Sequence, residues 1–319
     1  MSARTCFGKI TLNNNPQILL CPGQGAQHVG MGKAWADKFK VAADTFAQAD
    51  EALGYSISNL AFEGPEEELN KTDKAQVAIY VTSVACYRAL KEQGKIGNIV
   101  ATAGLSLGEF TALHLAGAFN FLNGLALVKL RGEAMQAAAE ATPSGMVALI
   151  GADEQQAIEL CKKSLEGGSP DEVMVPANLN CPGQIVVSGS QGACERSLKV
   201  AEEMGLRATA LKVAGAFHSP IMQPAAEKLA AALNKIEWDG LRCPVLSNVT
   251  AVTHEGDIKS IKQRLVEQLT SPVRWSSSMQ YAISNLPGQF VELAPGKVLM
   301  GLMRRIDKAT KVENHAEPG

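Results

Sequence analysis

A serine between two glycines is the first candidate for chemistry in this sequence. In the stretch GLSLGE, Ser106 lies between Gly104 and Gly108, after an apolar run and before a helical pattern. This spacing is typical of a nucleophile elbow, a tight strand-to-helix turn that exposes a serine hydroxyl. The following helix would direct backbone N–H groups and the positive end of its dipole toward that hydroxyl. The alternative is a glycine-rich turn in which the serine is incidental.

A nucleophilic serine needs a base, and His218 is the best placed of the five histidines. It lies between a predicted strand and a predicted helix, with Ser219 and Pro220 typical of an N-cap and a first helical position. A loop position of this kind presents a side chain at a cleft, although a partly buried structural histidine is the alternative. The other histidines are His28 in a glycine-rich loop, His114 on the helix after the serine, His254 in a polar turn and His315 in a polar tail.

No third member of a catalytic triad is evident. The α/β-hydrolases place an acid between the serine and the histidine in chain order. No Asp or Glu between residues 106 and 218 stands out for this role. The sequence therefore favours a Ser–His pair oriented by a neutral group at least as much as a complete triad.

A predicted helix over residues 121–141 carries an arginine on an apolar face. Gly124, Val128, Arg131 and Met135 follow the spacing of one helical face. A buried guanidinium needs a partner, because an unpaired charge is costly to remove from water. An internal ion pair, or a side chain that reaches out to solvent, would meet this need. Equally, the guanidinium would hold a ligand carboxylate through two parallel hydrogen bonds.

The elements around these residues predict an α/β fold. Apolar runs at 18–21 and 97–104 predict buried strands that lead into a glycine-rich loop and into the serine turn. The other elements predicted in this part of the fold are helices at 33–53, 74–93, 108–119, 121–141, 220–235 and 258–270, a strand at 243–250, and a strand, turn and helix over 288–306.

A change of pattern in the middle of the chain predicts an inserted domain. Between residues 145 and 213 the predicted order is β-α-β-β-α-β, which is typical of a ferredoxin-like unit. We therefore expect a large domain of residues 1–142 and 214–319, interrupted by a small domain of residues 143–213.

The composition excludes several classes of protein. The chain has 319 residues, 46% of them hydrophobic and 19% charged, with a formal net charge of −2 and a pI of about 6.2. Nucleic acid binding is not expected as a main function, because it needs a basic surface. Seven scattered cysteines without a CxxC pattern argue against a disulfide framework or a metal site, and favour a reducing compartment. No apolar run is long enough to span a membrane. The N-terminal residues form a polar tail without the apolar run of a signal peptide, so we expect a cytoplasmic protein.

Taken together, the motifs resemble those of the malonyl-CoA:acyl carrier protein transacylases and the related acyltransferase domains of polyketide synthases. The matching pieces, in chain order, are PGQGAQ, GLSLGE, KLRGEAM, NLNCPGQIVVSG, GAFHSP, EQLTSPVRW and PGKVLMGL. They extend from about residue 17 to residue 306, and their order and spacing are specific although each alone is weak. The resemblance implies an α/β-hydrolase-like large domain with an inserted ferredoxin-like small domain, in agreement with the element pattern.

The resemblance also implies roles for individual residues. Ser106 would be the nucleophile and His218 its base. Arg131 would hold the carboxylate of a malonyl group. The backbone N–H groups of Gln24 and Leu107 would bind the oxyanion of the tetrahedral intermediate.

Two further residues, Gln268 and Phe217, are assigned to the site by the same resemblance, and Met135 is added by its position on the helix. Gln268, in EQLTSP, would orient the histidine through a carbonyl group, which would explain the missing acid. Phe217 corresponds to the bulky residue of malonyl-selective members, and Met135, on the helix face of Arg131, is expected at the substrate site. Leu105 departs from the family, which often has a histidine before the nucleophile, and this changes the polarity expected of the pocket.

The implied reaction transfers a malonyl group from malonyl-CoA to the phosphopantetheine thiol of acyl carrier protein through a malonyl-serine. It would supply malonyl-acyl carrier protein for fatty acid or polyketide synthesis, with no metal or redox cofactor, and we expect a monomer. Two alternatives are a hydrolase that passes the acyl group to water and an inactive scaffold that docks carrier proteins. The presence of Ser106, His218 and Arg131 together argues against the scaffold.

Overall fold

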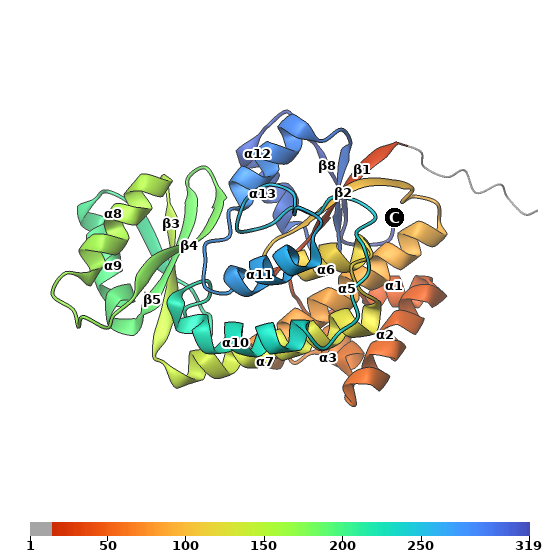
Figure 1. The fold of residues 1–319 in the computed structure, drawn as a ribbon, viewed down its shortest axis with the longest axis horizontal. Coiled ribbons are helices and arrows are strands. Elements are labelled where there is room, and N and C mark those ends of the chain that lie inside the picture. The colour runs from red at the N-terminus through yellow and green to blue at the C-terminus, as the bar shows by residue number, and fades with distance from the viewer. Residues whose placement is uncertain (1–14) are drawn as a thin grey trace, which may run out of the picture.

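The structure, a computed structural model, describes residues 15–319, so Cys6 and most of the predicted polar tail lie outside it. A parallel sheet and an antiparallel sheet organise these residues, and Figure 1 shows the antiparallel sheet toward the left end of the molecule. The α/β class with a separate small sheet is confirmed. The strands of the parallel sheet, in spatial order, are β2 (Asn98–Gly104), β1 (Pro16–Cys21), β7 (Gln289–Leu293) and β8 (Val312–His315).

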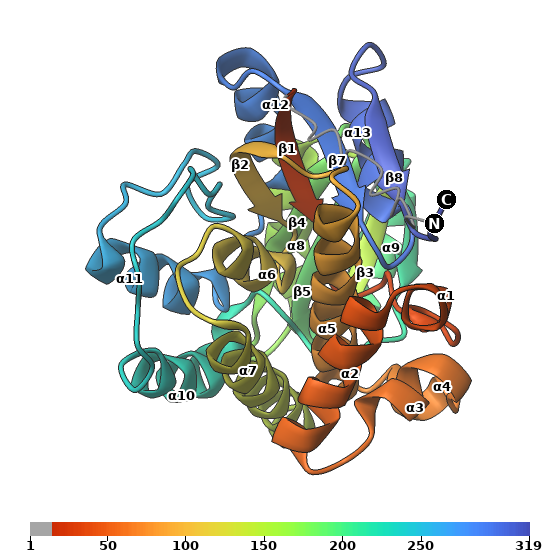
Figure 2. The same cartoon turned by 90° about the vertical axis from the view of Figure 1, so that its right-hand side faces the viewer.

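The parallel sheet is buried on both faces, which explains the uninterrupted apolar run of its central strand β1. Leu19 and Cys21 pack into one apolar core, and Ile18 and Leu20 pack into another on the opposite face. This alternation follows from the two-residue period of a strand. Helices that contribute to the first core include α5 (Thr72–Glu92) and α6 (Gly108–Leu115), and α12 (Trp275–Asn285) and α13 (Val298–Ile306) contribute to the second (Figure 2).

Most of the remaining helices enlarge the core on the α5 side of the sheet. None of the helices within residues 15–319 is both long and apolar enough to cross a membrane. The helices that enlarge this core are α1 (Lys33–Lys38), α2 (Lys40–Leu53), α3 (Ile57–Glu63), α4 (Glu66–Leu69), α7 (Phe121–Ala141), α10 (Gln223–Leu233), which follows a 3₁₀ turn at Pro220–Met222, and α11 (Ile258–Gln268).

The antiparallel sheet has the ferredoxin-like order that the sequence predicted. Its first and third strands in the chain are central, and its second and fourth are at the edges. Two helices share one apolar core with these strands. In chain order the elements are β3 (Ser144–Ile150), α8 (Glu154–Leu165), β4 (Met174–Cys181), β5 (Gln184–Ser190), α9 (Gln191–Glu203) and β6 (Arg207–Ala210).

Backbone pairing joins the small sheet to the rest of the molecule. The N–H of Val273, in the segment after α11, donates to the carbonyl of Ala177 at 2.8 Å. The carbonyl of Val273 accepts from the N–H of Leu179 at 2.9 Å. Both partners lie on β4, so this edge strand is held against the large part of the fold.

Several predicted details are wrong. The helix predicted at 33–53 is broken at Phe39, whose extended backbone (φ −127°, ψ 119°) separates α1 from α2. The strand predicted at 243–250 forms only isolated bridges at Val245 and Leu246, because each pairs singly with a different segment. The sequence did not predict α3, α4, α12 or β8. Of these, α4 and β8 have four residues each, which is too short for a periodic pattern.

The close approach of α7 to α5 depends on a glycine. A Cβ atom on Gly124 would overlap the hydroxyl of Tyr80, which donates to the carbonyl of Phe121 at 3.2 Å. In contrast, a Cβ atom on Gly301, on α13, would meet no atom within 4 Å. A glycine-to-alanine substitution at each site therefore distinguishes the effect of packing on stability from the effect of helix propensity.

Gly124→Ala should lower the free energy of unfolding by about 1–3 kcal/mol, because the added methyl overpacks the α5–α7 contact. Gly301→Ala is the matched control and should raise it by about 0.5–1 kcal/mol, because glycine in a helix is less favourable than alanine. Denaturant titration of the two variants measures both changes. Equal changes of the same sign would contradict the packing role of Gly124.

Candidate active site

Ser106 lies on the turn between β2 and α6 with a left-handed backbone (φ 54°). Such a conformation costs a non-glycine residue about 1–3 kcal/mol, so its surroundings must hold it. Asn248 does so, because its Oδ1 accepts from the N–H of Ser106 at 2.6 Å and its Nδ2 donates to the carbonyl of Gly104 at 2.7 Å. The flanking glycines are needed for space. A Cβ atom on Gly104 would overlap the carbonyl of Gly108, and one on Gly108 would overlap the carbonyl of Cys21.

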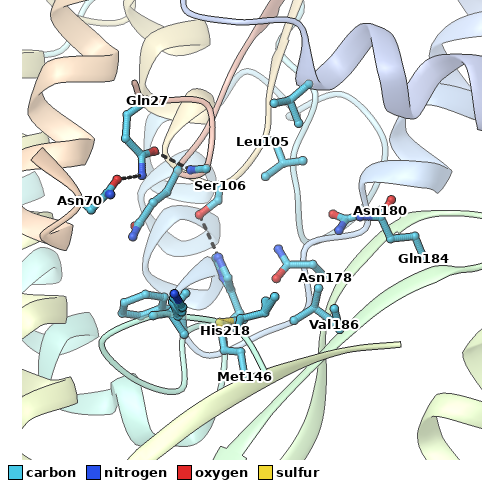
Figure 3. A pocket seen from close by; sticks show the side chains of 18 of the residues that line it. Gln27, Asn70, Leu105, Ser106, Met146, Asn178, Asn180, Gln184, Val186 and His218 are labelled. Carbon is cyan, nitrogen blue, oxygen red and sulfur yellow. Dashed lines mark hydrogen bonds between the residues drawn. The ribbon is translucent and has the colours of Figure 1, made fainter. Parts of the chain in front are cut away.

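The hydroxyl of Ser106 meets the imidazole of His218, with Oγ and Nε2 separated by 2.8 Å (Figure 3). On the other side of the ring, Nδ1 lies 2.8 Å from the backbone carbonyl oxygen of Gln268. Because a carbonyl oxygen only accepts, Nδ1 carries the proton, and Nε2 accepts from the serine hydroxyl. The geometry is that of a Ser–His pair in which a neutral imidazole presents its unprotonated Nε2 to the serine.

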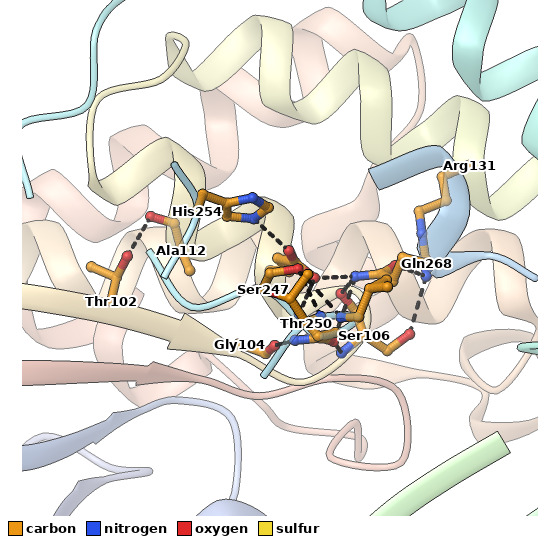
Figure 4. A network of polar contacts seen from close by, with 12 residues as sticks. Thr102, Gly104, Ser106, Ala112, Arg131, Ser247, Thr250, His254 and Gln268 are labelled. Carbon is orange, nitrogen blue, oxygen red and sulfur yellow. Dashed lines mark hydrogen bonds and ion pairs between the residues drawn. The ribbon is translucent and has the colours of Figure 1, made fainter. Parts of the chain in front are cut away.

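Arg131 contacts the same hydroxyl although it is only 1% exposed. Its Nη2 donates to Ser106 Oγ at 3.0 Å and to the side-chain oxygen of Gln268 at 2.9 Å (Figure 4). Its Nη1 donates to the side-chain oxygen of Gln76 at 2.5 Å. All three partners are neutral, and Nε has no hydrogen-bond partner among the described residues. Neither an internal ion pair nor exposure to solvent therefore satisfies this guanidinium.

Burial shifts the pKa of both groups beside the serine. Desolvation, and secondarily the positive charge of Arg131, lowers the pKa of His218 from 6.5 to about 4 against the opposing hydrogen bond to Gln268. Desolvation also lowers the pKa of Arg131 from 12.5 to about 9, with the charge of Glu109 opposing it. At neutral pH the site therefore holds a neutral base and a cation at one oxygen atom.

A buried carboxylate behind the serine turn was not indicated by the sequence. Glu109 is fully buried, and its Oε1 lies 2.8 Å from Nε2 of His254. Its Oε2 accepts from the side-chain amide of Gln268 at 2.6 Å and from the N–H of Asn248 at 3.2 Å. The interpretation of His254 as part of a polar segment missed its burial, because its partner lies 145 residues away in the chain. The only local signal is the position of Glu109 at the end of GLSLGE.

A cavity of about 590 Å³ opens beside the serine between the small sheet and the large part of the fold. Leu105, directly before the serine, lines it with an apolar side chain. The small sheet contributes Met146, Asn178 and Gln184, as Figure 3 shows. The predicted site residues on its wall are Gln24, Ser106, Met135, Phe217 and His218, and those behind the wall are Leu107, Arg131 and Gln268.

The two segments expected to bind an oxyanion touch at the serine turn. A Cβ atom on Gly23, next to Gln24, would overlap the carbonyl of Leu105. Leu107 directly follows the serine and is the N-cap residue of α6. Within residues 15–319, neither the backbone N–H of Gln24 nor that of Leu107 donates to a protein acceptor. No protein group among the described residues therefore occupies either N–H.

The other histidines lie away from the serine. His28 is exposed, with Nδ1 3.3 Å from the carbonyl oxygen of Ala26. His114 lies 2.9 Å from the carbonyl oxygen of Phe119, and burial lowers its pKa to about 4. His315 belongs to β8 rather than to a polar tail. Over the described part of the chain, no three His, Cys, Asp or Glu side chains are grouped so as to hold a metal ion.

The fold and the site define a protein of the α/β-hydrolase-like class with a Ser–His pair at its strand–helix turn. A family model described as "Acyl transferase domain" matches residues 18–316. The malonyl CoA-acyl carrier protein transacylase of Bacillus subtilis is 41% identical over 302 residues, which cover 94% of this chain and 93% of that protein. The chain therefore belongs to the acyl transferase domain family.

Solved structures agree with this assignment. The crystal structure of the malonyl CoA-acyl carrier protein transacylase from Clostridium perfringens is 40% identical, with a TM-score of 0.88 over 95% of this chain and 94% of that chain. A malonyl-transacylase in complex with its type II PKS acyl-carrier protein is 37% identical, with a TM-score of 0.89 over 96% of this chain and 97% of that chain. The shared fold therefore covers 95% and 96% of this chain in the two comparisons.

The pH dependence of serine reactivity tests the electrostatics of the pair. Because His218 stays neutral well below pH 6.5, the rate of Ser106 modification by a sulfonyl fluoride should hold from neutral pH down to about pH 5 and halve near pH 4. Arg131→Met removes the second cause of the shift and should move this acid limb to higher pH. Circular dichroism at each pH controls for unfolding. An acid limb near 6.5 in the unmodified chain would contradict the buried, cation-facing environment of His218.

Proposed function

We propose that this chain transfers a malonyl group from malonyl-CoA to the phosphopantetheine thiol of an acyl carrier protein through a malonyl-Ser106 ester. Malonyl-acyl carrier protein, the product, feeds fatty acid or polyketide synthesis. The observation that carries the proposal is the contact of Ser106 Oγ with both a neutral base and a buried cation. Family membership and the activity named for the relatives support the same conclusion.

In the first half-reaction, Nε2 of His218 removes the proton of Ser106 as Oγ attacks the thioester carbonyl carbon. The resulting oxyanion accepts hydrogen bonds from the free N–H groups of Gln24 and Leu107. The carbon–sulfur bond then breaks, and CoA leaves as a thiol with the proton that His218 held. The malonyl group remains on Ser106 as an ester.

In the second half-reaction, the same groups act on a different acceptor. The phosphopantetheine thiol gives its proton to His218, and its sulfur attacks the ester carbonyl carbon. The bond between that carbon and Oγ breaks, and the proton returns to Ser106. The carbonyl of Gln268 holds the imidazole in the required tautomer throughout, because Nδ1–H donates to it at 2.8 Å.

Selection of a malonyl group is the role proposed for Arg131. Its Nη2 is already 3.0 Å from Ser106 Oγ, so the free carboxylate of the short malonyl chain lies within its reach. An ester oxygen accepts hydrogen bonds more weakly than a hydroxyl, so acylation frees Nη2 for the carboxylate. An acyl group without a carboxylate leaves the buried guanidinium with neutral partners alone. Phe217 and Met135, on the cavity wall, limit the space for larger acyl groups.

We infer further properties from the same chain. We propose a monomer as the active unit, since Ser106, His218 and Arg131 contact one another within one chain. The six described cysteines are free and buried, which supports a reducing location such as the cytoplasm. Residues 143–213 would form a small domain within a large domain of residues 1–142 and 214–319.

Ser106→Ala should abolish the covalent intermediate, because no other group is placed to form the ester. Intact-protein mass spectrometry after mixing with malonyl-CoA measures this. His218→Ala should still acylate, but about 10²–10⁴-fold more slowly, because one base serves both steps. A malonyl adduct on the Ser106→Ala protein would overturn the assignment. Loss of the adduct to water, as fast without carrier protein as with it, would favour the hydrolase.

Arg131→Ala should lower kcat/KM for malonyl-CoA by about 10²-fold or more, because two charge-assisted hydrogen bonds of about 1.5–3 kcal/mol each are lost. Acetyl-CoA should be used equally well or better, so that selectivity inverts. Arg131→Lys should recover only part of the malonyl activity, since lysine lacks the planar fork. An equal loss with both substrates would make Arg131 a structural residue.

A further inference from the structure

We infer that Glu109, held by His254, is a positioning residue for malonyl selection that acts on Arg131 through the side-chain amide of Gln268. The inference rests on the proposed function and adds a residue outside the reacting groups. The Glu109 and His254 side chains are each 1% exposed, and neither lines the cavity. Any influence of the pair on substrate choice must therefore pass through other residues.

The first step is the orientation of the Gln268 amide. Its Nε2 donates to Glu109 Oε2 at 2.6 Å and to the backbone carbonyl of Ser106 at 3.0 Å. Its Oε1 accepts from Arg131 Nη2 at 2.9 Å. A flipped amide would set its oxygen against the Glu109 carboxylate and the Ser106 carbonyl, and its NH₂ group against the guanidinium. The carboxylate therefore turns an acceptor toward Arg131.

The second step is the orientation of Glu109 itself. Oε1 is held by His254 Nε2 at 2.8 Å, and Oε2 is fixed by the N–H of Asn248 at 3.2 Å as well as by Gln268. Figure 4 shows His254 and Arg131 at opposite ends of this chain of contacts. Because the His254 donor occupies one oxygen, the other oxygen faces Gln268.

The third step is charge. The groups packed around the guanidinium are neutral Gln76 from α5, the Phe110 ring from α6 at 5.4 Å, and Ser106, His218 and Gln268. Glu109 is the acid whose charge favours protonation of Arg131 against burial. Because one amide separates the two charges, the carboxylate stabilises the cation while Gln268 takes one N–H of Nη2 and leaves the N–H that faces Ser106 for a malonyl carboxylate.

Glu109→Gln keeps the shape and removes the charge. We expect the ratio of kcat/KM for malonyl-CoA to that for acetyl-CoA to fall about tenfold or more. We expect Arg131, whose pKa burial lowers to about 9, to produce an alkaline limb in malonyl transfer, and this limb should move to lower pH because the group that raises this pKa is gone. Acetyl transfer should show no such movement. Glu109→Asp restores a carboxylate and should return the limb toward its original position.

Glu292→Gln is the matched control. Glu292 is also a fully buried glutamate, which accepts from the N–H groups of Leu299 and Met300 and from the side chain of Asn314. Its substitution should alter stability and leave the malonyl-to-acetyl ratio and the alkaline limb unchanged. If Glu109→Gln does not fold, His254→Phe tests the positioning role of Glu109 independently. It removes the donor that orients Glu109, so the ratio should again fall.

The outcomes separate this inference from the proposed function. If the unmodified chain does not prefer malonyl-CoA, or if Arg131→Ala keeps the preference, the proposed function fails. If both behave as proposed, but Glu109→Gln or His254→Phe retains the ratio and the limb, the positioning role is overturned. A matching loss in Glu292→Gln would overturn it as well, because the effect would then belong to any buried glutamate.

Discussion

The hydroxyl of Ser106 is the contact on which the rest of the site depends, because three separate segments meet at it. Oγ lies 2.8 Å from His218 Nε2 and 3.0 Å from Arg131 Nη2, which are 112 and 25 residues away in the chain. A base next to this oxygen removes its proton, and a cation next to it stabilises the charge that remains. The same cation lowers the basicity of the imidazole. The site therefore has to balance two effects at one atom.

Burial achieves this balance because it lowers the pKa of both groups from very different starting values. Desolvation keeps His218 neutral at physiological pH, whereas the ordinary pKa of Arg131 is so high that the same desolvation leaves it charged. The cation is surrounded by amide and hydroxyl oxygens from Gln76, Gln268 and Ser106, which accept hydrogen bonds without cancelling its charge. A carboxylate in direct contact would have neutralised it. Glutamine side chains thus leave the charge available to an anionic ligand.

The reacting groups and much of the opposite wall of the active-site cavity come from different parts of the fold. Ser106, Arg131 and His218 belong to the large part of the molecule, whereas Met146, Asn178 and Val186 belong to the small sheet. The pairing of Val273 with β4 holds this sheet in place across the cavity. Substitutions on the small sheet can therefore change the shape of the pocket without touching the serine turn.

The sequence by itself determined the central strands, the glycine-flanked serine turn and the candidacy of Ser106, His218 and Arg131. Each of these follows from local spacing, since the two-residue and helical periods and the positions of glycine and proline depend on near neighbours. Only the tertiary structure decided that a backbone carbonyl holds His218, that neutral groups surround Arg131, and that Glu109 and His254 are buried together. Their partners lie 50, 137 and 145 residues away, and a hydrogen bond between distant segments leaves no periodic pattern in either one.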